Sequence, residues 1–215
     1  MTAVALAIAF FLGAVPWAYI VSRAVAGVDI RTLGDGNVGA RNTFKQVGHR
    51  SGVLVGLLDL AKGATAVMLA RQLGLEEMWV LVAGMMVVAG HDWNPFMRFQ
   101  GGQGFAPTVG VLLALMPQET LMAIVLVIIV LTLTRRWNLS SAVGFTSLPV
   151  VAALWSGQHY RMVVYLAAML SVVSIKRLVF LPRARRHTAR RRASQEASVA
   201  TDEQPEIRTP GTELR

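Results

Sequence analysis

Two short polar segments rich in glycine interrupt a chain that is otherwise strongly apolar. The first runs from Gly34 to Asn42, and the second runs from Gly90-His91 to Gly104. Glycines between apolar runs let the backbone turn sharply and aim consecutive N–H groups at one point, which is the geometry of a phosphate-binding nest. The sequence therefore predicts that these segments bind an anion such as a phosphate.

Several polar residues in and near these segments have both a structural and a functional interpretation. Asn37 and Asn42 are natural turn residues as well as candidate ligands. His91, at the end of an apolar run, is either a hydrogen-bonded structural histidine or a member of the site. Ser140 and Ser141 are either helix N-caps or contacts for a substrate.

Two pairs of opposite charges stand close together in the sequence. Asp59 and Lys62 lie three residues apart within an apolar run, so they share one helix face and can pair. Isolated charges in hydrocarbon are costly, so both are expected to face the interior, where the pair either fixes helix packing or lines the site. Asp29 and Arg31 are either a solvated surface pair or part of the site.

The composition is that of an integral membrane protein, because 54% of the 215 residues are apolar and only 15% are charged. The chain has no cysteine, and therefore no disulfide or thiolate nucleophile. A spanning helix needs about 20 residues, so the apolar runs predict a compact all-α bundle of about seven transmembrane helices. The third and fourth are short, so they are tucked inside the bundle or their link dips into it. The expected helices cover residues 3–22, 52–71, 77–91, 104–117, 120–134, 140–156 and 160–179.

Lysine and arginine are distributed unequally between the two ends of these expected helices. Only Arg71 and Arg161 fall in the turns at one end. By the positive-inside rule, the N-terminus faces outside, and the C-terminus and both glycine segments face the cytoplasm. The cytoplasmic end receives Arg23, Arg31, Arg41, Lys45, Arg50, Arg98, Arg135, Arg136, Lys176 and Arg177.

The chain changes character at Pro182. Residues 1–181 form the expected transmembrane domain, and residues 182–215 are first basic, then acidic, and rich in Ser, Thr, Glu and Pro. This composition predicts a disordered cytoplasmic tail. Its arginines either anchor the topology or adhere to anionic membrane lipids. Nucleic-acid binding is not expected, because the basic residues lie beside the membrane and lack interleaved aromatics.

A series of short motifs follows along the apolar chain: Gly13 to Pro16, Gly27-Val28-Asp29-Ile30-Arg31, Gly34 to Asn42, Asp59-Leu60-Ala61-Lys62-Gly63, and Gly90-His91 with Pro95-Phe96 and Gly101-Gly102-Gln103-Gly104. Their order and spacing over about residues 10–180 resemble those of the bacterial acyl-phosphate:glycerol-3-phosphate acyltransferase family. The resemblance implies a seven-helix enzyme of the bacterial plasma membrane with a cytoplasmic active face. Such enzymes move a fatty acyl group from acyl phosphate to the 1-hydroxyl of glycerol 3-phosphate, which gives lysophosphatidic acid for phospholipid synthesis.

This activity needs few catalytic groups, because an acyl phosphate is already activated. No cofactor, metal or serine nucleophile is expected, only grips for two phosphates, alignment of the hydroxyl and stabilisation of the oxyanion. The resemblance implies catalytic roles for Asp35, Asn37, His91 and Gln103. The implied substrate- and phosphate-binding residues are Gly34, Gly36, Gly39, Arg41, Asn42, Lys45, Gln100, Gly101, Gly102, Gly104, Ser140, Ser141 and Arg177.

The polar residues of these motifs depart from the family pattern although the glycines are kept. Gln100 and Gln103 stand where the family has lysines, and Asp35 stands where it has serine. Asp35 thus puts a carboxylate where an anionic substrate should bind. Arg41 could offset it, either by pairing with Asp35 or by binding a phosphate. Other replacements are Arg41 for threonine, Lys45 for arginine, Ser171 for histidine and Ser174 for asparagine.

Three functions are therefore compatible with the sequence. The first is the acyltransferase of the resembled family, with glycerol 3-phosphate and acyl phosphate as its partners. The second is an impaired or repurposed relative that binds a phosphorylated lipid intermediate. The third is a small membrane transporter in which Asp59 and Lys62 line a pathway, although no inverted repeat is evident.

Overall fold

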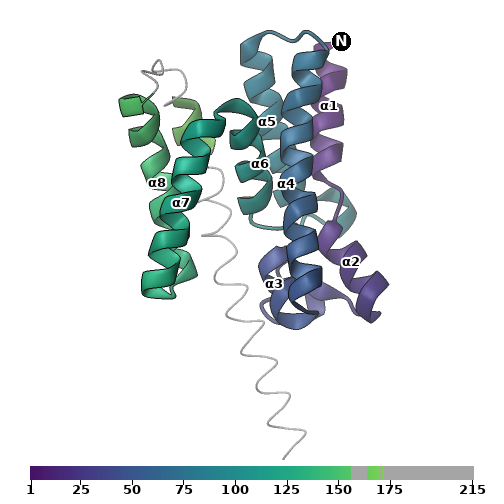
Figure 1. Cartoon of the computed structure of the whole chain (residues 1–215). Coiled ribbons are helices and arrows are strands. Elements are labelled where there is room, and N and C mark those ends of the chain that lie inside the picture. The colour runs from purple at the N-terminus through teal and green to yellow at the C-terminus, as the bar shows by residue number, and fades with distance from the viewer. Residues whose placement is uncertain (156–163, 170, 172–215) are drawn as a thin grey trace, which may run out of the picture.

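The computed structural model describes residues 1–155, 164–169 and 171, and every regular element in these ranges is a helix (Figure 1). The expected all-α membrane fold is confirmed. The expected seventh span over 160–179 lies mostly outside the described residues, as does the tail from 182 to 215. The α-helices are α1 (Thr2–Gly13), α2 (Trp17–Ala26), α3 (Ala40–Gln46), α4 (His49–Gln72), α5 (Glu77–Asp92), α6 (Phe105–Leu115), α7 (Pro117–Thr134) and α8 (Trp137–Trp155), with 3-10 helices η1 (Ile30–Thr32) and η2 (Pro95–Met97).

The first apolar run is broken into two helices, so the single helix expected over 3–22 is wrong. α1 ends at Gly13 and α2 begins at Trp17. Pro16 causes the break, because proline has no N–H and its ring clashes with the preceding helical turn. The carbonyls of Ala14 and Val15, just before the proline, thereby become available to side chains of other helices. Together α1 and α2 still provide 25 residues with the length and hydropathy of a membrane span.

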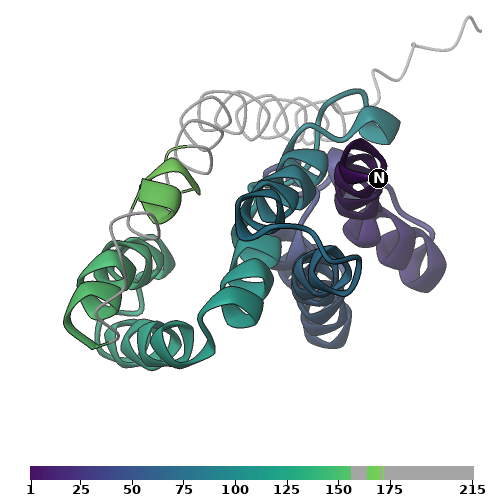
Figure 2. The same ribbon diagram turned by 90° about the horizontal axis from the view of Figure 1, so that it is seen from above.

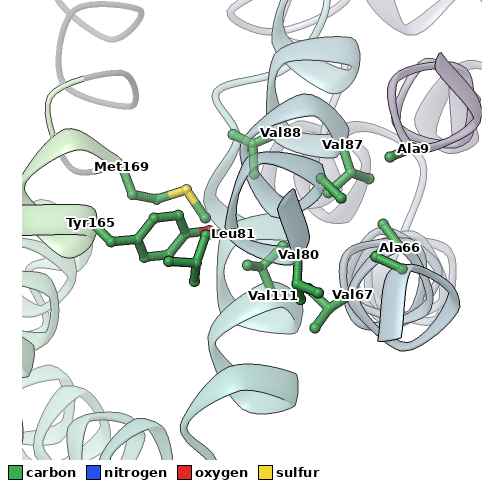
Figure 3. Close-up of a cluster of buried hydrophobic side chains, with 12 residues drawn as sticks. Ala9, Ala66, Val67, Val80, Leu81, Val87, Val88, Val111, Tyr165 and Met169 are labelled. Atoms are coloured by element: carbon green, nitrogen blue, oxygen red, sulfur yellow. The ribbon is translucent and has the colours of Figure 1, made fainter. Parts of the chain in front are cut away.

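The helices form two groups, which Figures 1 and 2 show from the side and from above. In the first group α1 packs on α5, and α4 packs on α5 and α6. In the second, α7 and α8 form an antiparallel hairpin to one side. Residues 164–169 join the groups: Tyr165 and Met169 contact a core made by α1, α4, α5 and α6 (Figure 3), while Leu166 packs with residues of α6, α7 and α8.

Glycines let two helix pairs approach until backbone meets backbone. In the α4–α6 pair, a Cβ on Gly63 would overlap the carbonyl of Pro107, and a Cβ on Gly110 would overlap that of Leu60. The α1–α5 pair repeats the arrangement, since Gly13 lies against Val87 and Gly90 lies against Phe10. Lipid tails are as apolar as the side chains, so the hydrophobic effect does not drive helices together within a membrane. Membrane helices therefore commonly associate through small residues, which allow close van der Waals packing.

Within the part of the chain that the structure describes, four helical segments have the length and hydropathy needed to cross a bilayer: the α1–α2 unit, α4, α7 and the first 18 residues of α8. The third and fourth expected spans are short, as predicted, since α5 has 16 residues and α6 has 11. Helix α3 was not expected. It follows the first glycine segment and ends at Gln46, and it packs closely on α4 because Gly52 has no side chain to hold the backbone of Phe44 away.

We predict that Gly63→Ala destabilises the protein and that Gly56→Ala does not. Both changes replace glycine by the better helix former within α4, which favours the helix by about 1 kcal/mol. At Gly63 the new methyl would overlap the backbone of α6, and overpacking of this kind costs about 1–3 kcal/mol. At Gly56 it would meet only the Cβ of Ala40, at an ordinary 3.5 Å.

Thermal unfolding of the detergent-solubilised variants measures the difference. The midpoint should fall for Gly63→Ala and stay equal or rise for Gly56→Ala. Equal midpoints for both variants would mean that the α4–α6 contact does not limit stability.

Candidate functional site

The two glycine segments lie at the same end of the helix bundle, opposite the N-terminus (Figure 1). The first follows η1 and leads into α3, and the second connects η2 to α6. They are also in contact: a Cβ on Gly102 would lie 2.9 Å from the carbonyl oxygen of Val38. The fold therefore brings together residues that are more than sixty positions apart in the sequence.

Asn42 holds the first glycine segment in shape. Its side-chain amide is buried and donates to the carbonyls of Ile30 at 3.2 Å, Leu33 at 3.0 Å and Asn37 at 3.1 Å. Gly34 has a positive φ of 57°, and a Cβ there would overlap Asn42 Oδ1. The amide hydrogens of Asn42 are thus used within the protein, which agrees with its role as a turn residue.

Asp35 bonds within the same segment rather than to Arg41. Its Oδ1 accepts from the N–H of Asn37 at 3.1 Å, which makes a local turn. Among the described residues no ion pair joins Asp35 to Arg41, so the expected compensation of charge by direct pairing is not formed. Arg41 and Lys45 are both exposed and lie four residues apart, hence on one face of α3.

Asp29 and Arg31 form an ion pair that precedes this segment. Arg31 Nη2 lies 2.7 Å from Asp29 Oδ2, and the Arg31 guanidinium also lies 5.3 Å from the centre of the Tyr19 ring. Hydrogen bonds from the Arg31 side chain hold the pKa of Asp29 below its usual value. Both side chains of the pair are thus engaged with each other.

The second segment uses its backbone differently from the expected phosphate nest. The N–H of Gly101 donates to the carbonyl of Asp92 at 3.2 Å, and the N–H of Gly102 donates to that of His91 at 3.1 Å. These bonds close the C-terminal end of α5, so the two donors are already used inside the protein. Glycine at these two positions lets the segment lie directly against His91, because a Cβ on either residue would overlap it.

Gly104 and Asp92 meet where α6 begins. Gly104 has a positive φ of 66°, and a Cβ there would lie 3.0 Å from both carboxylate oxygens of Asp92. Asp92 is fully buried. A carboxylate at a helix N-terminus is favoured by the helix dipole. This helix end therefore faces an anion that belongs to the chain itself.

A buried polar cluster lies next to the junction of the two segments. Lys62 Nζ lies 2.7 Å from Asp59 Oδ1, 2.9 Å from His91 Nδ1 and 3.1 Å from the carbonyl oxygen of Val15. The predicted Asp59–Lys62 ion pair is confirmed. All three side chains are more than nine-tenths buried. The other face of the His91 ring, at Nε2 and Cε1, packs on Gly102.

Asn94 and the carbonyls of the broken first span were not predicted as part of this region. Asn94 is buried and its amide donates to the carbonyl of Ala14 at 2.6 Å, beside the Val15 carbonyl that Lys62 binds. The available signal was Pro16 inside an apolar run, because a proline frees carbonyls in the preceding turn, and in a membrane these need a donor.

The serines after the α7–α8 turn bond within their own helix. Ser140 Oγ donates to the carbonyl of Arg136 at 3.0 Å and Ser141 Oγ to that of Asn138 at 3.1 Å. Of the two alternatives, the N-cap role is excluded because α8 starts earlier, at Trp137. The Trp137 ring lies 5.4 Å from that of Phe105, so α8 does approach the second glycine segment. Arg177 lies outside the described residues.

Beyond Gly104 the site borders an apolar cavity of about 290 Å³. Its walls come from α6, α7 and α8, beginning with Phe105, which directly follows the second glycine segment. Of the two glutamines expected in the second segment, Gln103 is partly exposed and Gln100 is exposed, as are the neighbouring Arg98 and Phe99.

Comparisons with known proteins agree with this arrangement. The family described as glycerol-3-phosphate acyltransferase matches residues 3–185. Glycerol-3-phosphate acyltransferase 1 of Dehalococcoides mccartyi is 40% identical over 171 residues, which cover 77% of this chain and 81% of that protein. The glycerol-3-phosphate acyltransferase of Desulforamulus reducens is 36% identical over 165 residues, covering 76% and 82%.

A solved structure has the same fold. It is the crystal structure of PlsY (YgiH), an integral membrane glycerol 3-phosphate acyltransferase, in its glycerol 3-phosphate form. The two structures agree with a TM-score of 0.77 at 25% identity, over 85% of this chain and 90% of that chain. By sequence and by fold, the chain belongs to the glycerol-3-phosphate acyltransferase family.

Proposed function

We propose that this protein transfers a fatty acyl group from acyl phosphate to glycerol 3-phosphate and so forms lysophosphatidic acid. The hydroxyl oxygen of glycerol 3-phosphate bonds to the carbonyl carbon, the bond from that carbon to the phosphate oxygen breaks, and inorganic phosphate leaves with the electron pair. The proton lost by the hydroxyl balances the charge of the departing phosphate, which leaves as hydrogen phosphate. Because the acyl donor is already activated, the tasks of the protein are to hold two phosphates, align the hydroxyl and stabilise the oxyanion.

The observation that carries this proposal is the convergence of both glycine segments on His91 at one end of the bundle. Val38, Gly102 and the His91 ring meet there although they come from different parts of the chain. Polar substrates could therefore bind in a single polar region at the end of an otherwise apolar bundle. Asn37 and Gln103, which flank it in the sequence, are the proposed hydroxyl- and carbonyl-aligning side chains.

The apolar cavity supports an acyl substrate. It opens next to Phe105 and extends between α6 and the α7–α8 hairpin, among apolar side chains such as Val109, Ile124 and Phe145. An acyl chain in this cavity would keep its methylenes out of water while its phosphate stays beside Gln103 and Gly104.

Phosphate binding is assigned to the exposed cations of α3. Arg41 and Lys45 share one helix face directly after the first glycine segment, and neither is in an ion pair in the described part of the chain. Neutral Gln100 and Gln103 cannot supply charge at the second segment. We therefore assign the two α3 cations to the phosphate of glycerol 3-phosphate, with Asp35 shaping the segment through Asn37.

The other two functions have less support. A transport pathway through Asp59 and Lys62 would need them to face a water-filled space, whereas both are buried against each other, His91 and Val15. Binding of a phosphorylated lipid without catalysis is favoured only by the neutral Gln100 and Gln103, and the experiments below separate it from acyl transfer.

We predict that Arg41→Gln and Lys45→Gln each weaken the use of glycerol 3-phosphate by the purified protein. A charge-assisted hydrogen bond to phosphate contributes about 1.5–3 kcal/mol, so kcat/KM should fall roughly tenfold to a hundredfold. The measurement is release of inorganic phosphate from acyl phosphate at varied glycerol 3-phosphate. Arg50→Gln removes one exposed charge from the same end and should change kcat/KM little. Absence of phosphate release by the unaltered protein would reject the proposed function.

We predict that Gln100→Lys with Gln103→Lys raises turnover by tenfold or more, since each lysine adds a phosphate-binding cation. Adding Asp35→Ser should raise it further by removing a carboxylate from the site. Single, double and triple variants are assayed with the same substrates. If no variant gains activity and the unaltered protein binds phosphorylated lipid without turning over acyl phosphate, the repurposed relative is the better description.

We also predict, from the asymmetry of Lys and Arg, that the site faces the cytoplasm and that the Glu76 turn faces outside. The cysteine-free chain allows a direct test with single cysteines. In intact cells a membrane-impermeant maleimide should label Glu76→Cys and not Thr32→Cys, and both should react after the cells are opened. Both residues are exposed in the structure, so labelling of Thr32→Cys in intact cells would reverse the orientation.

A further inference from the structure

The environment of the Lys62 ammonium determines where the protons on His91 lie. Three acceptor atoms surround Lys62 Nζ: Asp59 Oδ1 at 2.7 Å, His91 Nδ1 at 2.9 Å and the Val15 carbonyl oxygen at 3.1 Å. A lysine ammonium has three N–H donors and no lone pair. Its three donors thus match the three neighbours, each from a different helix or from the break in the first span.

The negative charge of Asp59, 2.7 Å away, favours the charged form of Lys62 against the cost of burying it. An opposite charge within 4 Å in a poorly solvated interior favours the ionised form of both partners over an isolated charge. Because the ammonium can only donate, His91 Nδ1 must accept, and it does so through the ring lone pair. A second proton on the ring would point an N–H at the ammonium. A charged Lys62 at this position therefore favours a neutral ring with its one proton on Nε2.

The protonated nitrogen faces the junction of the two glycine segments. A Cβ on Gly102 would overlap His91 Nε2 and would lie 2.9 Å from the carbonyl oxygen of Val38. The backbone of His91 is also held next to Gly102, since the Gly102 N–H donates to the carbonyl of His91. The position of the ring is thus set by Lys62 at one edge and by Gly102 at the other.

We propose that Lys62, kept charged by Asp59, is a positioning residue that fixes His91 as the neutral Nε2–H tautomer and aims that N–H at the junction of the glycine segments. His91 then serves acyl transfer as a hydrogen-bond donor to developing negative charge, and it is not the general base. A base needs a free lone pair, and the only lone pair on this ring is bound to Lys62. The catalytic part of this inference rests on the proposed function, whereas the tautomer does not.

The helix break at Pro16 contributes to the same arrangement of acceptors around Lys62. The third acceptor of the ammonium is the carbonyl of Val15, directly before the proline. This carbonyl also accepts from the N–H of Trp17 at 3.1 Å, which its two lone pairs allow. The break thus supplies the third acceptor at the point where Lys62 needs it.

The tautomer is measured by two-dimensional NMR of the full-length protein labelled with ¹⁵N-histidine, in detergent at pH 7, because the two ring nitrogens shift differently in the two tautomers. The spectrum of His91→Gln identifies the His91 signals. His49→Gln, which removes an exposed histidine, should leave them in place. We expect a protonated Nε2 and an unprotonated Nδ1. An Nδ1–H tautomer, a mixture of tautomers or a doubly protonated ring would overturn the proposal.

The role of Lys62 is tested with the double variant Asp59→Asn with Lys62→Met. It removes both charges together, since removing one alone would leave the other buried without a partner. We expect His91 to become a mixture of tautomers and kcat to fall roughly tenfold to a hundredfold, as is typical for loss of a group that orients a site histidine. KM for glycerol 3-phosphate should change little. The conservative variant Lys62→Arg, which keeps a donor and the charge, should retain the Nε2–H tautomer.

The outcomes separate this inference from the proposed function. An unchanged tautomer in the double variant would remove Lys62 from its assigned role, whatever the activity. A mixed tautomer with unchanged kcat would show that His91 is fixed but does not serve the reaction. If the unaltered protein releases no phosphate from acyl phosphate, the proposed function fails, and the NMR experiment still decides whether Lys62 sets the tautomer.

Discussion

The ion pair between Asp59 and Lys62 is the interaction on which the site end of this bundle depends. In hydrocarbon every polar group must find its partner inside the protein, so a charged pair at this depth dictates what surrounds it. Lys62 binds α5 through His91 and the first span through Val15. Replacing the lysine therefore affects three helices and the shape of both glycine segments, which meet on the far side of the same histidine ring.

Close helix packing allows these short-range contacts to form. Gly63 follows Lys62 directly and brings α4 against α6, while Gly90 precedes His91 directly and brings α5 against α1. Each glycine thus stands beside the polar residue that its contact positions. The same chain positions serve packing and chemistry, which explains how a small membrane protein can build a site with few polar side chains.

Much of the fold could be predicted from the sequence, because hydropathy and spacing are local signals. The apolar runs marked the crossing helices, and the i, i+3 spacing of Asp59 and Lys62 predicted their pairing. The break at Pro16 was missed because the apolar run continues across the proline, and a proline inside a membrane helix can kink it without ending it. The acceptors Ala14 and Val15 were missed because backbone carbonyls leave no mark in the sequence. For Gly101 and Gly102 the sequence indicated close backbone approach correctly, but it could not tell whether their N–H groups face a ligand or the end of α5.

The broken first span also has a consequence for biogenesis. Asn94 follows Ala14 by 80 residues and Lys62 follows Val15 by 47, so the nascent first span enters the bilayer before its hydrogen-bond donors exist. At about 5–20 residues per second, the ribosome needs roughly 4 to 16 seconds to cover the 80-residue interval. During this time the Ala14 carbonyl lacks the side-chain donor that it has in the folded protein. The contact between Asn94 and Ala14 can therefore form only after all of α5 has been made.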